Sequence, residues 1–164
     1  MIAMVGPGQN RNNSYGGGYN NSPRPQNPAP AVTLPEKKKL PEEYVDEAER
    51  VMQSLLKPDY KGNPAFDVTT SQIRKILSLI TDILNDENLR RDENLSEESY
   101  QKLQMARVRI AYDAGREQKV KTFVEKSGLL SYIKGVGKSR AEFIRFARYV
   151  ESLVAWHRYL GGRD

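Results

Sequence analysis

Apolar side chains recur at the 3.6-residue spacing of amphipathic helices along most of this 164-residue chain, from about residue 41 to residue 160. The clearest stripe consists of Ile73, Ile76, Leu77, Ile80, Ile83 and Leu84. We find no stretch that alternates apolar and polar residues as a half-buried strand does, and no internal repeat. The pattern therefore predicts an all-α fold, a compact bundle of five to six helices.

Helix-ending and capping residues divide this pattern into segments. Thr69 and Gln72 have the spacing of a capping box, and Gly128 and the Gly161-Gly162 pair are natural helix ends. The expected helices cover residues 41–56, 69–84, 96–114, a segment around Val120, Phe123 and Val124, residues 129–134, and residues 138–160. Pro58 ends the first of them, and residues 59–67 and 85–94 are expected to be loops.

The N-terminal part of the chain has a different composition. Residues 1–35 contain five Gly, six Pro and six Asn, and such a segment buries too little apolar surface to offset the entropy lost on ordering. We therefore expect a disordered Gly/Asn/Pro-rich tail over residues 1–38 and a single helical domain over residues 39–164.

Positive charge is concentrated in the C-terminal two-fifths of the chain. Residues 100–164 contain 14 basic and six acidic residues, a net charge of +8, whereas residues 36–99 have a net charge of −5. Cations at helical spacing suit a polyanion of regular geometry, and nucleic acid is the first candidate. A solvated helical surface, or a basic face that docks an acidic protein, remains an alternative.

The composition argues against most enzyme classes. The chain has no cysteine, and His157 is its only histidine, so we expect no thiolate or multi-histidine metal site, no cofactor and no catalytic residues. No apolar run approaches the roughly 20 residues that a membrane span needs. The first residues also lack the basic and apolar regions of a signal peptide, so we expect a cytoplasmic protein that has no membrane partner.

One turn allows a second interpretation. Gly135-Val136-Gly137, between two expected helices, resembles a helix-hairpin-helix motif, in which backbone N–H groups bind a phosphate. Lys138 would add a charge-assisted contact. The turn is therefore compatible with a stand-alone helix-hairpin-helix nucleic-acid-binding protein, or simply with a glycine turn between packed helices.

Several blocks of residues together resemble one family. They cover residues 44–50, 61–63, 69–78, 108–117, 120–121, 145–157 and 161–162. In this order and spacing they are similar to the small helical subunit of the type III-A (Csm) CRISPR effector complex, a ribonucleoprotein of antiviral defence. The resemblance covers about residues 42–164 and leaves out the N-terminal tail.

The resemblance implies a non-enzymatic, structural role. Small subunits of this family stack as copies along a ribonucleoprotein filament, face its backbone subunits, and line the channel that holds guide RNA and target RNA. Cleavage belongs to the backbone and large subunits. Because guide–target specificity comes from base pairing, the small subunit needs only sequence-independent contacts to phosphates and sugars.

Eight basic residues in or beside the matched blocks are therefore predicted to contact RNA: Arg74, Lys75, Arg109, Arg116, Lys119, Lys121, Arg145 and Arg148. Arginine suits this role because its planar guanidinium binds phosphate in a bidentate way. The alternative for each is a surface salt bridge, such as Arg116 with Asp113 or Arg148 with Glu151. Contacts between copies are expected from aromatic residues of the last helix, namely Tyr149, Trp156 and Tyr159.

Overall fold

The computed structural model describes residues 3–8, 28 and 32–164. Most of the predicted disordered tail, residues 1–38, therefore lies outside the described residues. The helical unit spans Leu34–Asp164, so residues 34–38, which the sequence analysis places in the tail, belong to this unit.

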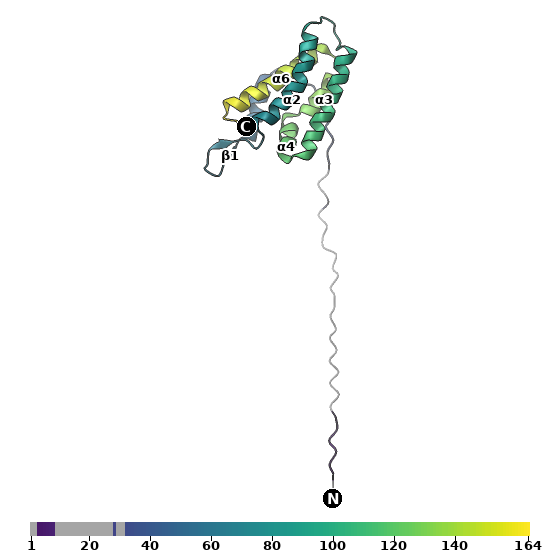
Figure 1. Cartoon of the computed structure of the whole chain (residues 1–164), viewed down its shortest axis with the longest axis vertical. Coiled ribbons are helices and arrows are strands. Elements are labelled where there is room, and N and C mark those ends of the chain that lie inside the picture. The colour runs from purple at the N-terminus through teal and green to yellow at the C-terminus, as the bar shows by residue number, and fades with distance from the viewer. Residues whose placement is uncertain (1–2, 9–27, 29–31) are drawn as a thin grey trace. The chain divides into compact units, whose positions relative to one another are not determined.

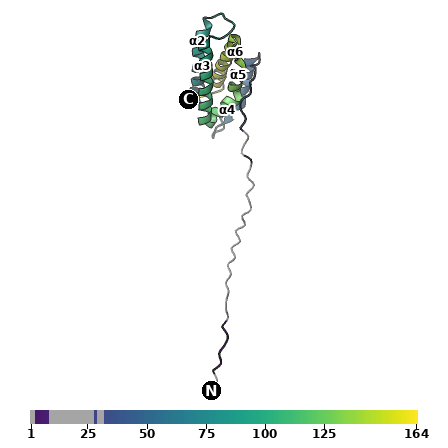
Figure 2. The same cartoon turned by 90° about the vertical axis from the view of Figure 1, so that its right-hand side faces the viewer.

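Six helices make up the described part of the helical unit, and the predicted all-α class is confirmed (Figures 1 and 2). They are α1 (Tyr44–Leu55), α2 (Thr70–Asn88), α3 (Glu97–Arg116), α4 (Gln118–Ser127), α5 (Leu129–Val136) and α6 (Arg140–Tyr159). One helix start and one helix end follow from local chemistry. Thr69 and Gln72 form the predicted capping box, and Gly128 ends α4 in the left-handed region at φ 67°.

Helix α6 is the centre of the core. It packs against α1, α2 and α5, and its buried residues include Phe143, Phe146, Tyr149, Val150 and Leu153. The apolar stripe of α2 faces the same core, as its spacing predicts, and α2 also packs against α3. Helix α2 lies between α3 and α6 and contacts both helices (Figure 1). Exposed side chains of α3 and exposed side chains of α6 therefore lie on different sides of α2.

A short extended segment, which we call the strap (residues 34–40), lies across α5. The Lys38 N–H donates to the Ser131 carbonyl at 3.1 Å, and Lys134 Nζ donates to the Pro35 carbonyl at 2.5 Å. Gly135 faces the strap so closely that an added Cβ would overlap the Lys38 carbonyl oxygen and lie 2.7 Å from the carbonyl carbon. The strap therefore requires glycine at position 135.

Glu87 is a fully buried carboxylate that joins three segments of the chain. Its Oε1 accepts hydrogen bonds from the Ser96 N–H and from Arg90 Nη1, both at 3.2 Å. Arg140, the first residue of α6, lies 3.6 Å from Oε2 through its Nε and also donates to the Glu87 carbonyl oxygen. Burial alone would raise the pKa of Glu87, but Ser99, the Ser96 N–H and Arg90 outweigh burial and lower the pKa.

Two very short strands at the ends of the segment from Lys57 to Ala65 depart from the all-α pattern. Strands β1 (Lys57–Pro58) and β2 (Pro64–Ala65) pair antiparallel. The Asp59 carboxylate closes the turn between them by accepting from the N–H groups of Lys61 at 2.7 Å and Asn63 at 2.9 Å. Strands of two residues are too short to produce an alternating pattern, so the sequence does not reveal them.

Candidate nucleic-acid interface

The start of α2 carries the first two predicted RNA-contacting residues. Arg74 and Lys75 follow the Thr69–Gln72 capping box by one turn, and both are exposed. Among the described residues, the Arg74 side chain has neither a hydrogen bond nor a salt bridge. The position near the positive end of the α2 dipole adds to the local attraction for anions.

The C-terminal end of the chain holds the start of α2 in place. His157 is fully buried, and its Nε2 lies 3.0 Å from the Val68 carbonyl oxygen, just before the cap. Burial lowers the pKa of His157, so the neutral imidazole donates to that carbonyl. The Thr70 N–H donates to the Arg163 carbonyl at 3.0 Å. His157 thus has a packing role at the start of α2, the helix that carries Arg74 and Lys75.

Helix α3 carries a row of three cations seven residues apart, and it extends through Arg116 as the row requires. Lys102 is neutralised, because its Nζ pairs with Asp86 and Glu98, each at 2.8 Å. Arg109 and Arg116 are exposed, and neither has a salt bridge among the described residues. The cationic part of the row therefore consists of Arg109 and Arg116.

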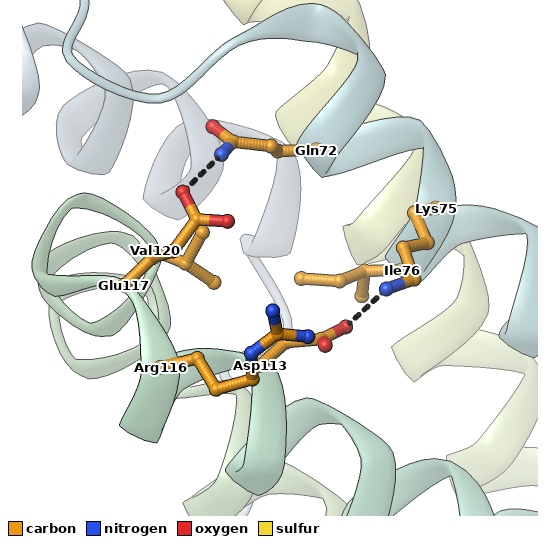
Figure 3. A pocket seen from close by; sticks show the side chains of 7 residues that line it. All are labelled: Gln72, Lys75, Ile76, Asp113, Arg116, Glu117 and Val120. Atoms are coloured by element: carbon orange, nitrogen blue, oxygen red, sulfur yellow. Dashed lines mark hydrogen bonds and ion pairs between the residues drawn. The ribbon is translucent and has the colours of Figure 1, made fainter.

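A small pocket lies between α2, α3 and the start of α4 (Figure 3). Its volume is about 70 Å³, and its lining consists of Gln72, Lys75, Ile76, Asp113, Arg116, Glu117 and Val120. Lys75 Nζ pairs with Asp113 at 2.9 Å, and Gln72 Nε2 donates to Glu117 at 2.8 Å. These two contacts fix the start of α2 against the α3–α4 junction, which leaves the Arg116 guanidinium beside Lys75 at the rim.

Helix α4 adds the remaining two cations of this surface. Lys119 lies 3.6 Å from Glu117, and Lys121 lies 4.0 Å from Glu125; all four side chains are largely exposed. Such exposed pairs are worth little in water, so the lysines can exchange them for phosphate contacts at low cost. We define the α2–α3–α4 surface as Arg74, Lys75, Arg109, Arg116, Lys119 and Lys121.

The other two predicted residues lie elsewhere, on α6. Arg145 donates to the carbonyl oxygens of Leu40 at 3.0 Å and Pro41 at 2.7 Å and pairs with Glu142, so it holds the end of the strap. Arg148 pairs with Glu151 at 2.9 Å, the alternative that the sequence also allows. Of the eight predicted cations, Lys75 and Arg116 thus line one pocket, four more lie on α2, α3 and α4, and these two lie on α6.

The Gly135-Val136-Gly137 turn is occupied by other parts of the chain. Gly135 lies inside α5 and faces the strap, as described above. At the start of α6 the Arg140 N–H donates to the Glu93 carbonyl at 2.9 Å, and Lys138 Nζ lies 5.0 Å from the Tyr100 ring centroid. Because these groups already have partners, the turn acts as a packed connection, and the geometry gives the helix-hairpin-helix interpretation no support.

The structure corrects one expected contact between copies and adds a surface that the sequence reasoning missed. Tyr149 is fully buried and its hydroxyl donates to the Ser127 carbonyl at 2.7 Å, so it cannot contact another copy. Met105, Val108 and Tyr112 are instead exposed on the outward face of α3. Their spacing opposite the buried Leu103 and Ile110 is visible in the sequence and could have revealed them.

The described residues contain neither a group of metal ligands nor a membrane-spanning helix. No three His, Asp or Glu side chains there are grouped so that they could hold a metal ion. None of the helices that the structure describes is both long and apolar enough to cross a bilayer.

Comparison with known proteins gives consistent matches over the helical unit. The family model described as Csm2 Type III-A matches residues 41–163. A Streptococcus thermophilus protein named "CRISPR system Cms protein Csm2" is 44% identical over 124 residues, which are 75% of this chain and 95% of that protein. A protein of the same name from Mycobacterium tuberculosis (strain CDC 1551 / Oshkosh) is 38% identical over 125 residues, 76% of this chain and 97% of its own length.

A more distant relative of the same name, from Enterococcus italicus, is 33% identical over 94 residues, which are 56% of this chain and 67% of that protein. The matched region coincides with the helical unit and includes all six residues of the α2–α3–α4 surface. The chain therefore belongs to the Csm2 family, the small subunits of type III-A CRISPR complexes.

Proposed function

We propose that this chain is a non-catalytic structural subunit of a cytoplasmic type III-A CRISPR ribonucleoprotein, and that its α2–α3–α4 surface contacts guide RNA and target RNA in antiviral defence. The family supports membership in a complex with other Csm subunits. The observation that carries the RNA contact is that Lys75 of α2 and Arg116 of α3 line one pocket beside the start of α4. Arg74 and Arg109 lie on the same two helices, and Arg74, Arg109 and Arg116 lack salt bridges among the described residues.

The charge balance favours phosphate as the ligand. The six cations outnumber the carboxylates that pair with them. Lys75 pairs with Asp113, Lys119 with Glu117 and Lys121 with Glu125. The two lysine pairs on α4 are exposed and therefore weak. The starts of α2 and α4 lie at the same surface and add partial positive charge from their helix dipoles. No base-reading arrangement is needed, because contacts to phosphate and ribose hold an RNA strand whatever its sequence.

Arg109→Ala combined with Arg116→Ala is expected to weaken RNA binding by the assembled complex roughly 10–100-fold at moderate salt, because two charge-assisted contacts are lost. The slope of log affinity against log salt should decrease in magnitude by about 1.4–1.8. The measurement is a salt titration of target-RNA binding with circular dichroism to verify the fold.

Lys102→Ala is the matched control, since it removes a cation from the same helical row whose charge is already neutralised by Asp86 and Glu98. It should leave the salt slope unchanged. A double arginine variant that folds normally and retains the wild-type slope would exclude these two residues from the RNA site.

Contacts between copies are part of the same proposal. Trp156 and Tyr159 form an edge-to-face pair with ring centroids 5.5 Å apart at the end of α6, and the Tyr159 side chain is 80% exposed. Exposed aromatic side chains of this kind are enriched at protein interfaces.

Tyr159→Ala should shift the mass distribution towards the monomer in size-exclusion chromatography with light scattering, because the proposed contact loses its aromatic anchor. Tyr60→Ala, which removes an equally exposed tyrosine from the β1–β2 turn, should not shift it. Identical distributions for the two variants would argue against a contact through α6.

A further inference from the structure

The outward face of α3 combines apolar and cationic side chains in an order that the proposed phosphate contacts do not explain. Met105 is 57% exposed, Val108 58% and Tyr112 63%. Gln101, Ala111 and Gly115 complete the stripe, which carries no carboxylate from Gln101 to Arg116; Glu97, one turn earlier, accepts from Gln101 Nε2 at 2.9 Å. A stripe of large exposed apolar groups on a small domain marks a binding surface.

Tyr112 lies between Arg109 and Arg116, two arginines of α3 that have no salt bridge among the described residues. At 1.5 Å of rise per residue, it is about 4.5 Å along the helix axis from Arg109 and about 6 Å from Arg116. The Arg116 guanidinium carbon is 5.5 Å from the Tyr112 ring centroid, a cation–π contact that places the cation over one face of the ring and leaves the other face for a base. The arrangement is therefore an exposed aromatic ring with a cation on each side along one helix.

This order of groups matches the chemistry of single-stranded nucleic acid. Such strands are bound by aromatic side chains on which unpaired bases stack, together with cations that follow the phosphates. In an A-form duplex the bases are already stacked on one another and are not offered to a flat ring on a convex helix. The two arginines also favour a polyanion over an apolar protein surface as the occupant.

We propose that Tyr112 is a stacking platform for an unpaired RNA base, with Arg109 and Arg116 holding the neighbouring phosphates. This inference rests on the proposed RNA-binding function and adds to it a ligand class, unstacked nucleotides of single-stranded RNA. Met105 and Val108 extend the platform with an apolar surface for an adjoining base or ribose.

The test uses the full chain and an oligouridylate that contains a single 2-aminopurine. Wild-type binding should quench the 2-aminopurine fluorescence, because the base stacks on the ring. Tyr112→Ala and Tyr112→Leu should both abolish the quenching and lower the affinity about 5–150-fold, the equivalent of 1–3 kcal/mol per stacked base. Tyr112→Phe should retain both, since the ring remains.

Two comparisons separate stacking from other roles of this face. Tyr60→Ala removes an exposed tyrosine of the β1–β2 turn and should leave affinity and quenching unchanged. An RNA duplex of equal length should bind wild type and Tyr112→Ala equally, because duplex binding uses only phosphate contacts.

Retained quenching in Tyr112→Ala or Tyr112→Leu would overturn the proposal, as would a wild-type chain that does not quench the probe. Unchanged RNA binding together with lost retention of another Csm subunit would assign the face to protein docking instead. If the Arg109/Arg116 double variant still weakens RNA binding in the complex, these outcomes remove the stacking site alone and leave the proposed function intact.

Discussion

Glu87→Ala is expected to lower the free energy of unfolding by about 3–5 kcal/mol, which corresponds to a decrease of about 10–20 °C in Tm for a domain of this size. Glu87 is fully buried, and its removal leaves Arg140 without a carboxylate partner and Arg90 with Asp92 alone. The junction of α2, the following loop and α6 should therefore loosen. Chemical denaturation monitored by circular dichroism measures the change.

Asp86→Ala is the matched control for Glu87, because the adjacent carboxylate pairs with Lys102 at the surface and should cost less than about 1 kcal/mol. Equal unfolding free energies for the two variants would show that Glu87 does not hold the junction.

The same carboxylate predicts a pH dependence. The pKa of Glu87 is lowered in the folded state, so the unfolded chain binds more protons in acid, and the contribution to stability is present above the unfolded-state pKa near 4.5 and is lost as pH falls. The difference in unfolding free energy between wild type and Glu87→Gln should therefore be largest near neutral pH and decrease below pH 4.5. A difference that does not change with pH would contradict the ionised state of Glu87.

Gly135→Ala is expected to displace the strap and to destabilise the helical unit by about 1–3 kcal/mol, the usual cost of overpacking. The new methyl group would overlap the Lys38 carbonyl oxygen, which is backbone and cannot rotate away. Docking of Leu40, which is buried, would be lost together with the Lys38–Ser131 hydrogen bond. Trypsin should then cleave after the strap lysines, residues 37–39, faster than in wild type.

Gly115→Ala is the matched control at a second helical glycine, and it is expected to raise the stability of the protein. A Cβ at position 115 would meet no atom within 4 Å, so alanine should stabilise α3 by up to about 1 kcal/mol through its higher helix propensity. If Gly135→Ala also stabilised the protein and left trypsin cleavage unchanged, the strap would not depend on Gly135.

Features encoded by neighbouring residues could be predicted from the sequence. The capping box of Thr69 and Gln72 and the glycine end of α4 at Gly128 are both confirmed, because their chemistry needs only residues within one turn of the chain. The apolar stripe of α2 also faces the core as predicted. Val45 is an exception: its helical spacing from Ala48 and Met52 predicts a buried side chain, but Val45 is exposed, whereas Val51 is buried.

Features that depend on distant residues could not be predicted. Glu87 meets Arg140 across 53 positions, and Gly135 meets Lys38 from the other end of the helical unit. No local pattern distinguishes the buried Glu87 from the exposed Asp86 beside it. Helical spacing alone does not show that α6 is enclosed by α1, α2 and α5. The sequence therefore does not distinguish the buried Tyr149 from an exposed aromatic residue of the same helix.

The candidate site shows the same division. Its cations are recognisable in the sequence as residues of basic, helix-patterned blocks. That Lys75 and Arg116 line one pocket, that Lys102 is neutralised by Asp86, and that Arg145 holds the strap all depend on tertiary contacts. The sequence therefore predicts the chemistry of the surface but not its boundary.

The most direct test of the central claim is UV cross-linking of RNA to the ribonucleoprotein purified through a tagged copy of this chain, followed by mass spectrometry of the cross-linked peptides. The account predicts that other Csm subunits and guide RNA are recovered, and that cross-links map to the start of α2 and to the segment from Arg109 to Lys121. Recovery of the chain without these partners, or cross-links that lie only outside these segments, would contradict it.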